Sequence, residues 1–229
     1  SAYNIMSRLR SSKAALYEHL LGTAQTISLL GLSEGVKKTG TGNMIQKLGA
    51  KVAAELPLIK LSCELPDWLT TKEAFEKACV EDIKTLQNIL TYLEKMSFGR
   101  EIAKAKKLAE LSKSHELILA FDSHLISLEV IRIELQKLQP DHPVFIATGS
   151  NDTGKKEVMK QFARDAKGRG IALCSDSMSE GLNLQGASAI VHIAQFFNSA
   201  LRNAAREALA IELAIAGNFD LEQVGERVD

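Results

Sequence analysis

From residue 115 onward, short apolar runs alternate with segments whose apolar residues recur at helical spacing. The runs have the length and the Ile and Val content of buried parallel strands. They predict strands at 115–122, 143–148, 170–174 and 188–193. The remaining segments predict helices at 124–138, 154–166 and 196–216. Strands joined largely by helices favour an α/β fold with a parallel sheet and right-handed connections.

The earlier part of the chain follows a helical pattern with one irregular interruption. Apolar residues recur near helical spacing over 1–30 and 70–113, which predicts helices there. Residues 31–70 contain a glycine-rich basic loop and two prolines, and they predict a flexible insertion with a short helix around 43–55. The expected domains are a mainly helical segment over 1–113 and an α/β domain over 114–229.

Composition narrows the class of protein further. The chain has 229 residues, 45% hydrophobic and 24% charged, and its net charge is zero. This composition is average for a globular protein, and it provides no global basic surface for nucleic acid. The three cysteines and five histidines are scattered, which argues against a zinc site and favours a reducing, cytoplasmic compartment. No apolar run is long enough to predict a membrane span.

The most informative stretch joins the last two predicted strands. Residues 175–185 read Ser-Asp-Ser-Met-Ser-Glu-Gly-Leu-Asn-Leu-Gln, which concentrates hydrogen-bonding groups beside a glycine. A loop at the carboxyl end of a parallel strand is where open α/β sheets bind ligands. This stretch resembles motif V of superfamily 2 helicases and translocases, and the likeness is closest to the SWI/SNF-type and bacterial RNA-polymerase-recycling branch.

The resemblance implies a nucleic-acid-driven ATPase, with this chain as its C-terminal RecA-like domain. In that family the hydroxyl at Ser175 touches a nucleic-acid phosphate, and the residues at Gly181 and Asn183 lie by the ribose and phosphates of ATP. Gln185 helps to hold the loop, and Ser175 and Asn183 are expected on a surface-exposed loop at the carboxyl edge of the sheet. The ATP-binding residues implied in this way are Glu180, Gly181, Asn183 and Gln185.

Two other segments carry shorter likenesses to the same family. The strand at 116–122 resembles motif IV, which places Phe121 and Asp122 among the implied nucleic-acid contacts. Residues 8–16 read Arg-x-x-Ser-Ser-x-x-Ala-Leu, similar to the signature before the second RecA domain. The same residues are also typical of a basic helix start capped by Ser11 or Ser12.

Residues 149–156 have two interpretations. They read G-x-x-x-x-G-K-K after a predicted strand, which resembles a phosphate-binding P-loop, but Lys156 replaces the hydroxyl that would ligate Mg²⁺. In the helicase interpretation they form the glycine turn and helix start before motif V, and a lysine replaces an early arginine. This second interpretation is preferred. It adds Gly149, Ser150, Lys155 and Lys156 to the implied nucleic-acid contacts.

Several parts of a complete ATPase site are not visible in the sequence. The Gln-Arg-x-Gly-Arg-x-x-Arg motif does not follow 188–193, although Arg202 and Arg206 lie one helical turn apart. The Walker A loop and the Asp-Glu box belong to the first RecA domain of the family. ATP and Mg²⁺ are therefore expected to be shared with an N-terminal RecA-like domain of the same polypeptide, and this chain alone is expected not to hydrolyse ATP.

Two alternatives remain open at this point. A small-phosphate-ligand-binding α/β module would use 149–156, with Thr148 or Ser150 and the helix N-terminus holding the anion. The second alternative is a catalytically inactive interaction domain. The sequence does not distinguish DNA from RNA as the partner, and it gives no sign of a membrane partner.

Overall fold

A computed structural model describes residues 2–32, 42–54, 56, 65–149, 151–178 and 184–193. The chain divides into two compact units, Ser1–Phe98 and Gly99–Asp229. No helix in the described parts of the chain is long and apolar enough to cross a membrane. Each unit is described by itself below.

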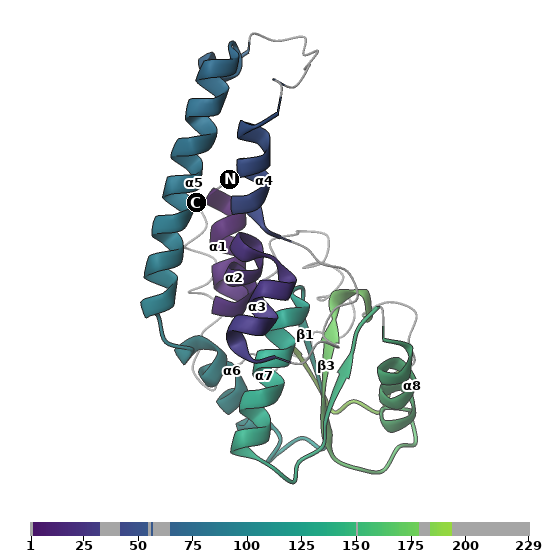
Figure 1. Ribbon diagram of the computed structural model, residues 1–229. Helices are drawn as coiled ribbons and strands as arrows, with labels where there is room; N and C mark the ends of the chain where they lie inside the picture. Colours follow the sequence, from purple (N-terminus) through teal and green to yellow (C-terminus); the bar gives the residue numbers. More distant parts are fainter. Residues whose placement is uncertain are drawn as a thin grey trace, which may run out of the picture. The chain divides into compact units, whose positions relative to one another are not determined.

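The first unit is helical (Figure 1). Its elements are α1 (Ala2–Ser11), α2 (Lys13–Leu21), α3 (Thr23–Leu30), α4 (Met44–Val52), the 3-10 helix η2 (Asp67–Leu69) and α5 (Lys72–Lys95). The single helix predicted over 1–30 is wrong in one respect, because the segment forms three helices. Ser12 caps α2 by accepting a hydrogen bond from the Ala15 N–H at 2.8 Å. Gly22 separates α2 from α3 with a φ of 89°, which favours glycine.

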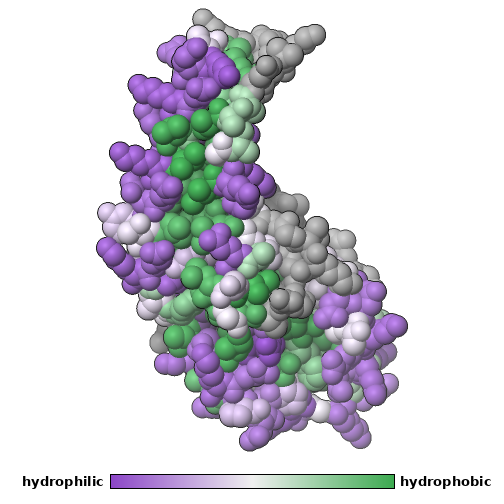
Figure 2. All heavy atoms as spheres, in the orientation of Figure 1, coloured by the Kyte–Doolittle hydropathy of each residue, from purple (hydrophilic) through white to green (hydrophobic). Residues whose placement is uncertain are grey.

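The core of the first unit forms between α2 and α5, where Leu16 and Leu20 pack with Leu86 and Leu93. A stripe of hydrophobic residues bordered by hydrophilic ones is visible along α4 and α5 (Figure 2). The ammonium group of Lys13 donates hydrogen bonds to the carbonyls of Glu94 and Met96 at the end of α5. A cation at a helix C-terminus stabilises the unsatisfied carbonyls there. Lys13 therefore holds α2 against the end of α5.

The second unit is an α/β structure. Its elements are α6 (Gly99–Leu111), β1 (Leu117–Asp122), α7 (Leu125–Leu138), β2 (Val144–Ala147), α8 (Asp152–Gln161), β3 (Gly170–Ser175), the 3-10 helix η3 (Asp176–Met178) and β4 (Ala189–His192). The four strands are parallel and lie in the order β2-β3-β1-β4. The predicted α/β class is confirmed: a parallel sheet flanked by helices, preceded by a mainly helical segment.

The two faces of the sheet bury different side chains, because successive residues of a strand point to opposite faces. Ile118 and Ala120 of β1 belong to the cluster that packs with α6 and α7. Leu117, Leu119 and Phe121 belong to the cluster that includes Val158 and Phe162, at α8 and its end. Figure 1 shows α7 on one side of the strands and α8 on the other.

Some boundaries differ from those expected. Helix α8 begins at Asp152 and ends at Gln161, whereas 154–166 was predicted. Helix α6 groups with the sheet, because Ala105 and Leu108 pack into the core of the second unit; the expected boundary after residue 113 lies at the far end of this helix. The short helix expected around 43–55 is confirmed as α4. The helix expected at 196–216 lies outside the described residues.

Candidate functional site: the carboxyl edge of the sheet

Three strands end in polar residues that lie next to one another. Asp122 at the end of β1 is the register partner of Ser175 at the end of β3, and Ala147 of β2 pairs with Cys174. Asp122 is 0% exposed, Ser175 is 6% exposed and Thr148, directly after β2, is 3% exposed. The carboxyl edge of the sheet therefore holds a buried row of polar groups from segments far apart in the sequence.

Ser175 was expected on a surface-exposed loop, and this expectation is wrong. It is the last residue of β3, and its hydroxyl accepts a hydrogen bond from the Gly149 N–H at 3.3 Å. The Ser175 Oγ also lies 2.8 Å from the Ser177 Oγ. Ser177, which the sequence analysis did not single out, is exposed and extends the hydroxyl pair to the surface. The Ser-Asp-Ser spacing of 175–177 was the feature of the sequence that could have identified Ser177. Two residues of separation here bring the Ser177 hydroxyl next to the Ser175 hydroxyl.

Gly149 lies close to this hydroxyl pair. A Cβ atom at Gly149 would stand 2.8 Å from the Ser177 Oγ, so a side chain at this position would displace Ser177. The glycine turn after β2 and the start of the motif V stretch are thus held together by the Gly149–Ser175 hydrogen bond, across 26 residues of sequence.

Asp122, the register partner of Ser175, lies in a cluster of charged groups. Its carboxylate accepts a hydrogen bond from the His124 N–H at 2.9 Å and lies 4.0 Å from the Lys104 ammonium group. Burial lowers the pKa of Lys104, although the charge of Asp122 opposes that shift. Burial and the charge of Asp122 raise the pKa of Asp176 to about 6, while His124 acts in the opposite direction. The cluster can therefore take up a proton near pH 6 beside Ser175.

The two residues of the predicted motif IV contact are not at the surface. Phe121 is 5% exposed, lies in the core under α8 and stacks on His192 with ring centroids 5.8 Å apart. Asp122 is fully buried and interacts with Lys104. The apolar strand pattern explains both placements, because β1 is a central strand covered on both faces. Direct contact of either side chain with nucleic acid would require the edge to open.

The start of α8 bears on the P-loop interpretation. The Asn151 side chain caps the helix by accepting the Gly154 N–H at 2.9 Å, so this N–H is already satisfied within the protein. A Cβ at Gly154 would lie 2.2 Å from the carbonyl oxygen of Ile146, which shows that this glycine lets α8 approach β2. In a P-loop the backbone N–H groups instead surround the phosphates. The second glycine of G-x-x-x-x-G thus has a packing role here.

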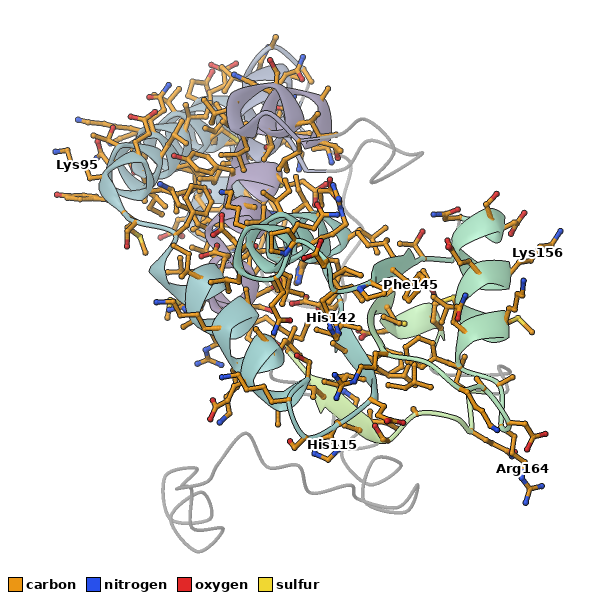
Figure 3. All side chains as sticks on the ribbon, turned by 90° about the horizontal axis from the view of Figure 1, so that it is seen from below. Lys95, His115, His142, Phe145, Lys156 and Arg164 are labelled. Carbon is orange, nitrogen blue, oxygen red and sulfur yellow. The ribbon has the colours of Figure 1, made fainter. Side chains whose placement is uncertain are left out.

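Lys155 and Lys156 are the fourth and fifth residues of α8, after the glycine turn, as the helicase interpretation expected. Lys155 is half-buried and Lys156 is exposed. Figure 3 shows Lys156 projecting away from the helix into solvent. Ser150, which was grouped with them, lies outside the described residues.

The predicted ATP-binding stretch is described only at its end. Glu180, Gly181 and Asn183 lie outside the described residues, and the Gln185 side chain is exposed. Gly186 anchors the segment, since its N–H donates to the Phe162 carbonyl at 3.0 Å and a Cβ there would lie 2.2 Å from the Ala163 carbonyl oxygen. The glycine at 186 is evident in the sequence, but its packing role is not. That role depends on the turn at Phe162 and Ala163, more than 20 residues earlier in the chain.

Metal and thiol chemistry have little support in the described parts of the chain. Within them, no group of three or more His, Cys, Asp or Glu side chains is placed to hold a metal ion. Burial raises the pKa of Cys174 to about 12, which keeps this thiol protonated and unreactive at neutral pH. The carboxyl edge therefore offers the hydroxyls of Ser175 and Ser177, which suit an anionic ligand.

Comparison with known proteins gives likenesses to solved structures alone. No family model matches the chain, and no curated protein matches it. The crystal structure of the C-terminal part of the Fun30 ATPase domain is similar at 18% identity and a TM-score of 0.38, covering 90% of this chain and 74% of that one. A likeness of this degree carries no argument about residues or activity, so any function has to be argued from the site itself.

Proposed function

We propose that this chain is the C-terminal RecA-like lobe of an ATP-dependent nucleic-acid helicase or translocase. In this proposal it contributes half of the ATP cleft and half of the nucleic-acid track. The observation that carries the proposal is the hydrogen bond from the Gly149 N–H to the Ser175 hydroxyl at the carboxyl edge. It joins the two segments that resemble consecutive helicase elements at the edge where open α/β sheets bind ligands.

The residues divide into two groups in this proposal. Ser175, Ser177 and the turn at Gly149 face a phosphate of the nucleic acid, with Lys155 and Lys156 adding charge at the start of α8. Glu180, Gly181, Asn183 and Gln185 face the nucleotide, and this assignment rests on the resemblance alone. Mg²⁺ and the γ-phosphate would be held mainly by the N-terminal RecA-like domain, and closure of the two lobes would complete the site.

One stretch of chain would then touch both ligands. Ser175 begins the stretch and is fixed to β3, while Gly186 ends it and is fixed to the turn after α8. Because the stretch connects these two anchored ends, a shift caused by nucleotide at 180–183 would change the position of the Ser175–Ser177 hydroxyl pair. Coupling of this kind is reciprocal, so nucleic acid would also alter the affinity for nucleotide.

The small-phosphate-module alternative gains no specific support. Asn151 occupies the helix N-terminus, Gly154 serves packing, and the acidic Asp152 lies in the first turn of α8. An anion at this helix start would have to displace the Asn151 cap and approach the Asp152 carboxylate.

The experiment uses the parent polypeptide carrying the N-terminal RecA-like domain. Asn183→Ala is expected to lower nucleic-acid-stimulated ATP hydrolysis about tenfold, the effect of losing one hydrogen bond of about 1.4 kcal/mol. Ser175→Ala is expected to weaken nucleic-acid binding more than ATP binding. Ser114→Ala, an exposed serine before β1 at the opposite edge, is the matched control and is expected to change neither. Stimulated turnover by the 229-residue chain alone, or an unaffected Asn183→Ala enzyme, contradicts the proposal.

A further inference from the structure

We propose that the outer face of α8 extends the nucleic-acid track as a basic stripe that contacts backbone phosphates. The stripe consists of Lys156, Lys160 and Arg164. The inference rests on the proposed function, because it assigns the stripe to the same ligand as the Gly149–Ser175 edge. It adds an interaction surface that the motif resemblance does not contain.

The stripe lies opposite the face of α8 that packs on the sheet. Gly154, Val158 and Phe162 recur every four residues and are buried, with Val158 and Phe162 at 0% exposure. Lys156 and Lys160 each follow one of these residues by two positions, which is about 200° around a helix with 3.6 residues per turn. Both lysines are exposed, and Arg164 is exposed in the turn after the helix. Figure 3 shows the labelled Lys156 and Arg164 both extending away from the ribbon on this side.

The charges of this region are not balanced locally. Residues 152–169 carry six cations and three carboxylates, although the whole chain has a net charge of zero. The cations are Lys155, Lys156, Lys160, Arg164, Lys167 and Arg169. Among the residues that the structure describes, none of these six forms an ion pair. In the space-filling view the surface over α8 is hydrophilic (Figure 2).

The opposite face of the same sheet shows that this imbalance is not general. Four cations on α6 and α7 each lie within 4.0 Å of a carboxylate. They are Lys104, Lys107, Arg132 and Lys137. The cations of α8 therefore remain available to a polyanion, whereas four of the cations on α6 and α7 are paired within the protein.

Continuity with the carboxyl edge favours nucleic acid over an acidic protein. Helix α8 starts three residues after Gly149, Lys156 is its fifth residue, and Lys160 follows one turn later. Four residues of helix rise about 6 Å. This is comparable with one to two nucleotide steps of about 3.4 Å along one strand. A phosphate backbone can therefore contact successive cations of the stripe.

The test compares two triple variants of the 229-residue chain. Lys156→Glu/Lys160→Glu/Arg164→Glu reverses the stripe. Lys47→Glu/Lys77→Glu/Lys84→Glu makes the same change in net charge at exposed lysines of α4 and α5. Binding of fluorescein-labelled single-stranded DNA, duplex DNA and duplex RNA is measured by anisotropy between 25 and 200 mM KCl, roughly the range over which backbone contacts dominate the salt dependence.

The stripe variant is expected to bind at least tenfold more weakly at the lowest salt, and the slope of log K against log salt is expected to become shallower by about 2 to 3, close to 0.9 per lost phosphate contact. The control is expected to keep the wild-type slope. Circular dichroism checks folding, and Lys156→Gln/Lys160→Gln/Arg164→Gln replaces the reversal variant if that one does not fold.

Three outcomes contradict the proposals in distinguishable ways. Nucleic-acid binding by the wild type with an unchanged slope in the stripe variant overturns the stripe and leaves the proposed function standing. Fluorescein-labelled poly-glutamate is measured in the same way, and loss of its binding in the stripe variant without loss of nucleic-acid binding assigns the surface to an acidic protein and also overturns the stripe. A wild-type chain that binds none of the three nucleic acids overturns the proposed function and the stripe together.

Discussion

The two faces of the four-stranded sheet use their charged residues in different ways. On the α6/α7 face, Lys104 reaches the fully buried Asp122, and Arg132 makes two hydrogen bonds to the Glu129 carboxylate. On the α8 face, the described cations form no ion pair, and all of them except the half-buried Lys155 are exposed. The comparison shows that one face pairs several of its charges within the protein, while the other carries cations with no ion pair among the described residues.

The buried row of polar groups at the carboxyl edge lies on the α6/α7 face of the sheet. By strand alternation, Asp122 and Ser175 point to the same face as Ile118 and Ile171, which pack with α6 and α7. The Lys104–Asp122 pair thus supports the hydroxyl that is proposed to meet a phosphate. Each prediction below removes one feature that distinguishes the two faces.

The largest effect is expected from Asp122→Ala. The substitution removes the partner of Lys104 and the acceptor of the His124 N–H in a fully buried position. The free energy of unfolding is expected to fall by about 3 kcal/mol, as for other broken buried pairs. Urea unfolding measures the change. Glu134→Ala, which breaks a pair with the exposed Lys137, is the control and is expected to cost less than about 1 kcal/mol.

A double variant separates charge from packing at the same position. Lys104→Met with Asp122→Leu replaces both charges by apolar groups and is expected to recover more than half of the loss, because no buried charge is left alone. A double variant as unstable as Asp122→Ala would show that the hydrogen bond to His124, and not the ion pair, stabilises this face.

The next largest effect is expected from Gly154→Ala on the α8 face. The added Cβ would lie 2.2 Å from the Ile146 carbonyl oxygen, so α8 must move away from β2. The expected cost is about 2 kcal/mol of unfolding free energy, typical of overpacking. Gly168→Ala is the matched control, because a Cβ there meets no atom within 4 Å. Equal stabilities of the two variants would contradict the packing role of Gly154.

The sequence predicted the elements of the second unit better than the contacts between them. The strands were visible because apolar runs rich in Ile and Val recur between helical segments. Both bounds of the predicted helix at 154–166 were wrong, because the start depends on the Asn151 cap and the end on the turn at Phe162. Gly22 and Ser12 divide the first segment into three helices in the same way.

The site was predictable only in outline. Ser175 could be placed at the end of a strand, since the apolar run before it stops there. Its burial could not be predicted, because the hydrogen bond from Gly149 and the cluster around Asp122 depend on the strand order β2-β3-β1. The spacing of Lys156 and Lys160 was readable, but the absence of an ion pair at either lysine in the described structure was not.

A smaller effect is expected from pH at Asp176. Its pKa is raised to about 6, so the folded protein holds a proton that the unfolded chain loses near pH 4. The ionised group therefore lowers the free energy of unfolding progressively as pH rises from about 4 to 6. Asp176→Asn is expected to remove this dependence and to stabilise the protein at pH 7.5 by about 1 kcal/mol, after allowance for solvent screening.

Urea unfolding at pH 4.5 and 7.5 measures this effect. The control is Asp165→Asn, an exposed carboxylate in the turn after α8, which is expected to leave the pH dependence as in the wild type. The same slope with pH in Asp176→Asn and wild type would contradict the assignment of the proton to Asp176.

The smallest effect on stability is expected from single substitutions of two lysines, one on each face of the sheet. The same two substitutions are expected to give the sharpest contrast between the faces in nucleic-acid binding. Lys160→Ala on α8 and Lys137→Ala on α7 each truncate an exposed lysine near the end of a helix, and each is expected to change the free energy of unfolding by less than about 0.5 kcal/mol. They differ in partners, because Lys137 lies 2.6 Å from the Glu134 carboxylate and Lys160 has no carboxylate partner among the described residues.

Binding of duplex DNA is therefore expected to distinguish these two variants, although their free energies of unfolding are expected to be similar. Lys160→Ala should make the slope of log K against log salt shallower by about 0.9, the effect of one phosphate contact, whereas Lys137→Ala should leave it unchanged. Equal slopes would show that an unpaired cation on this sheet is no more available to nucleic acid than a paired one. The distinction between the faces would then be one of structure alone.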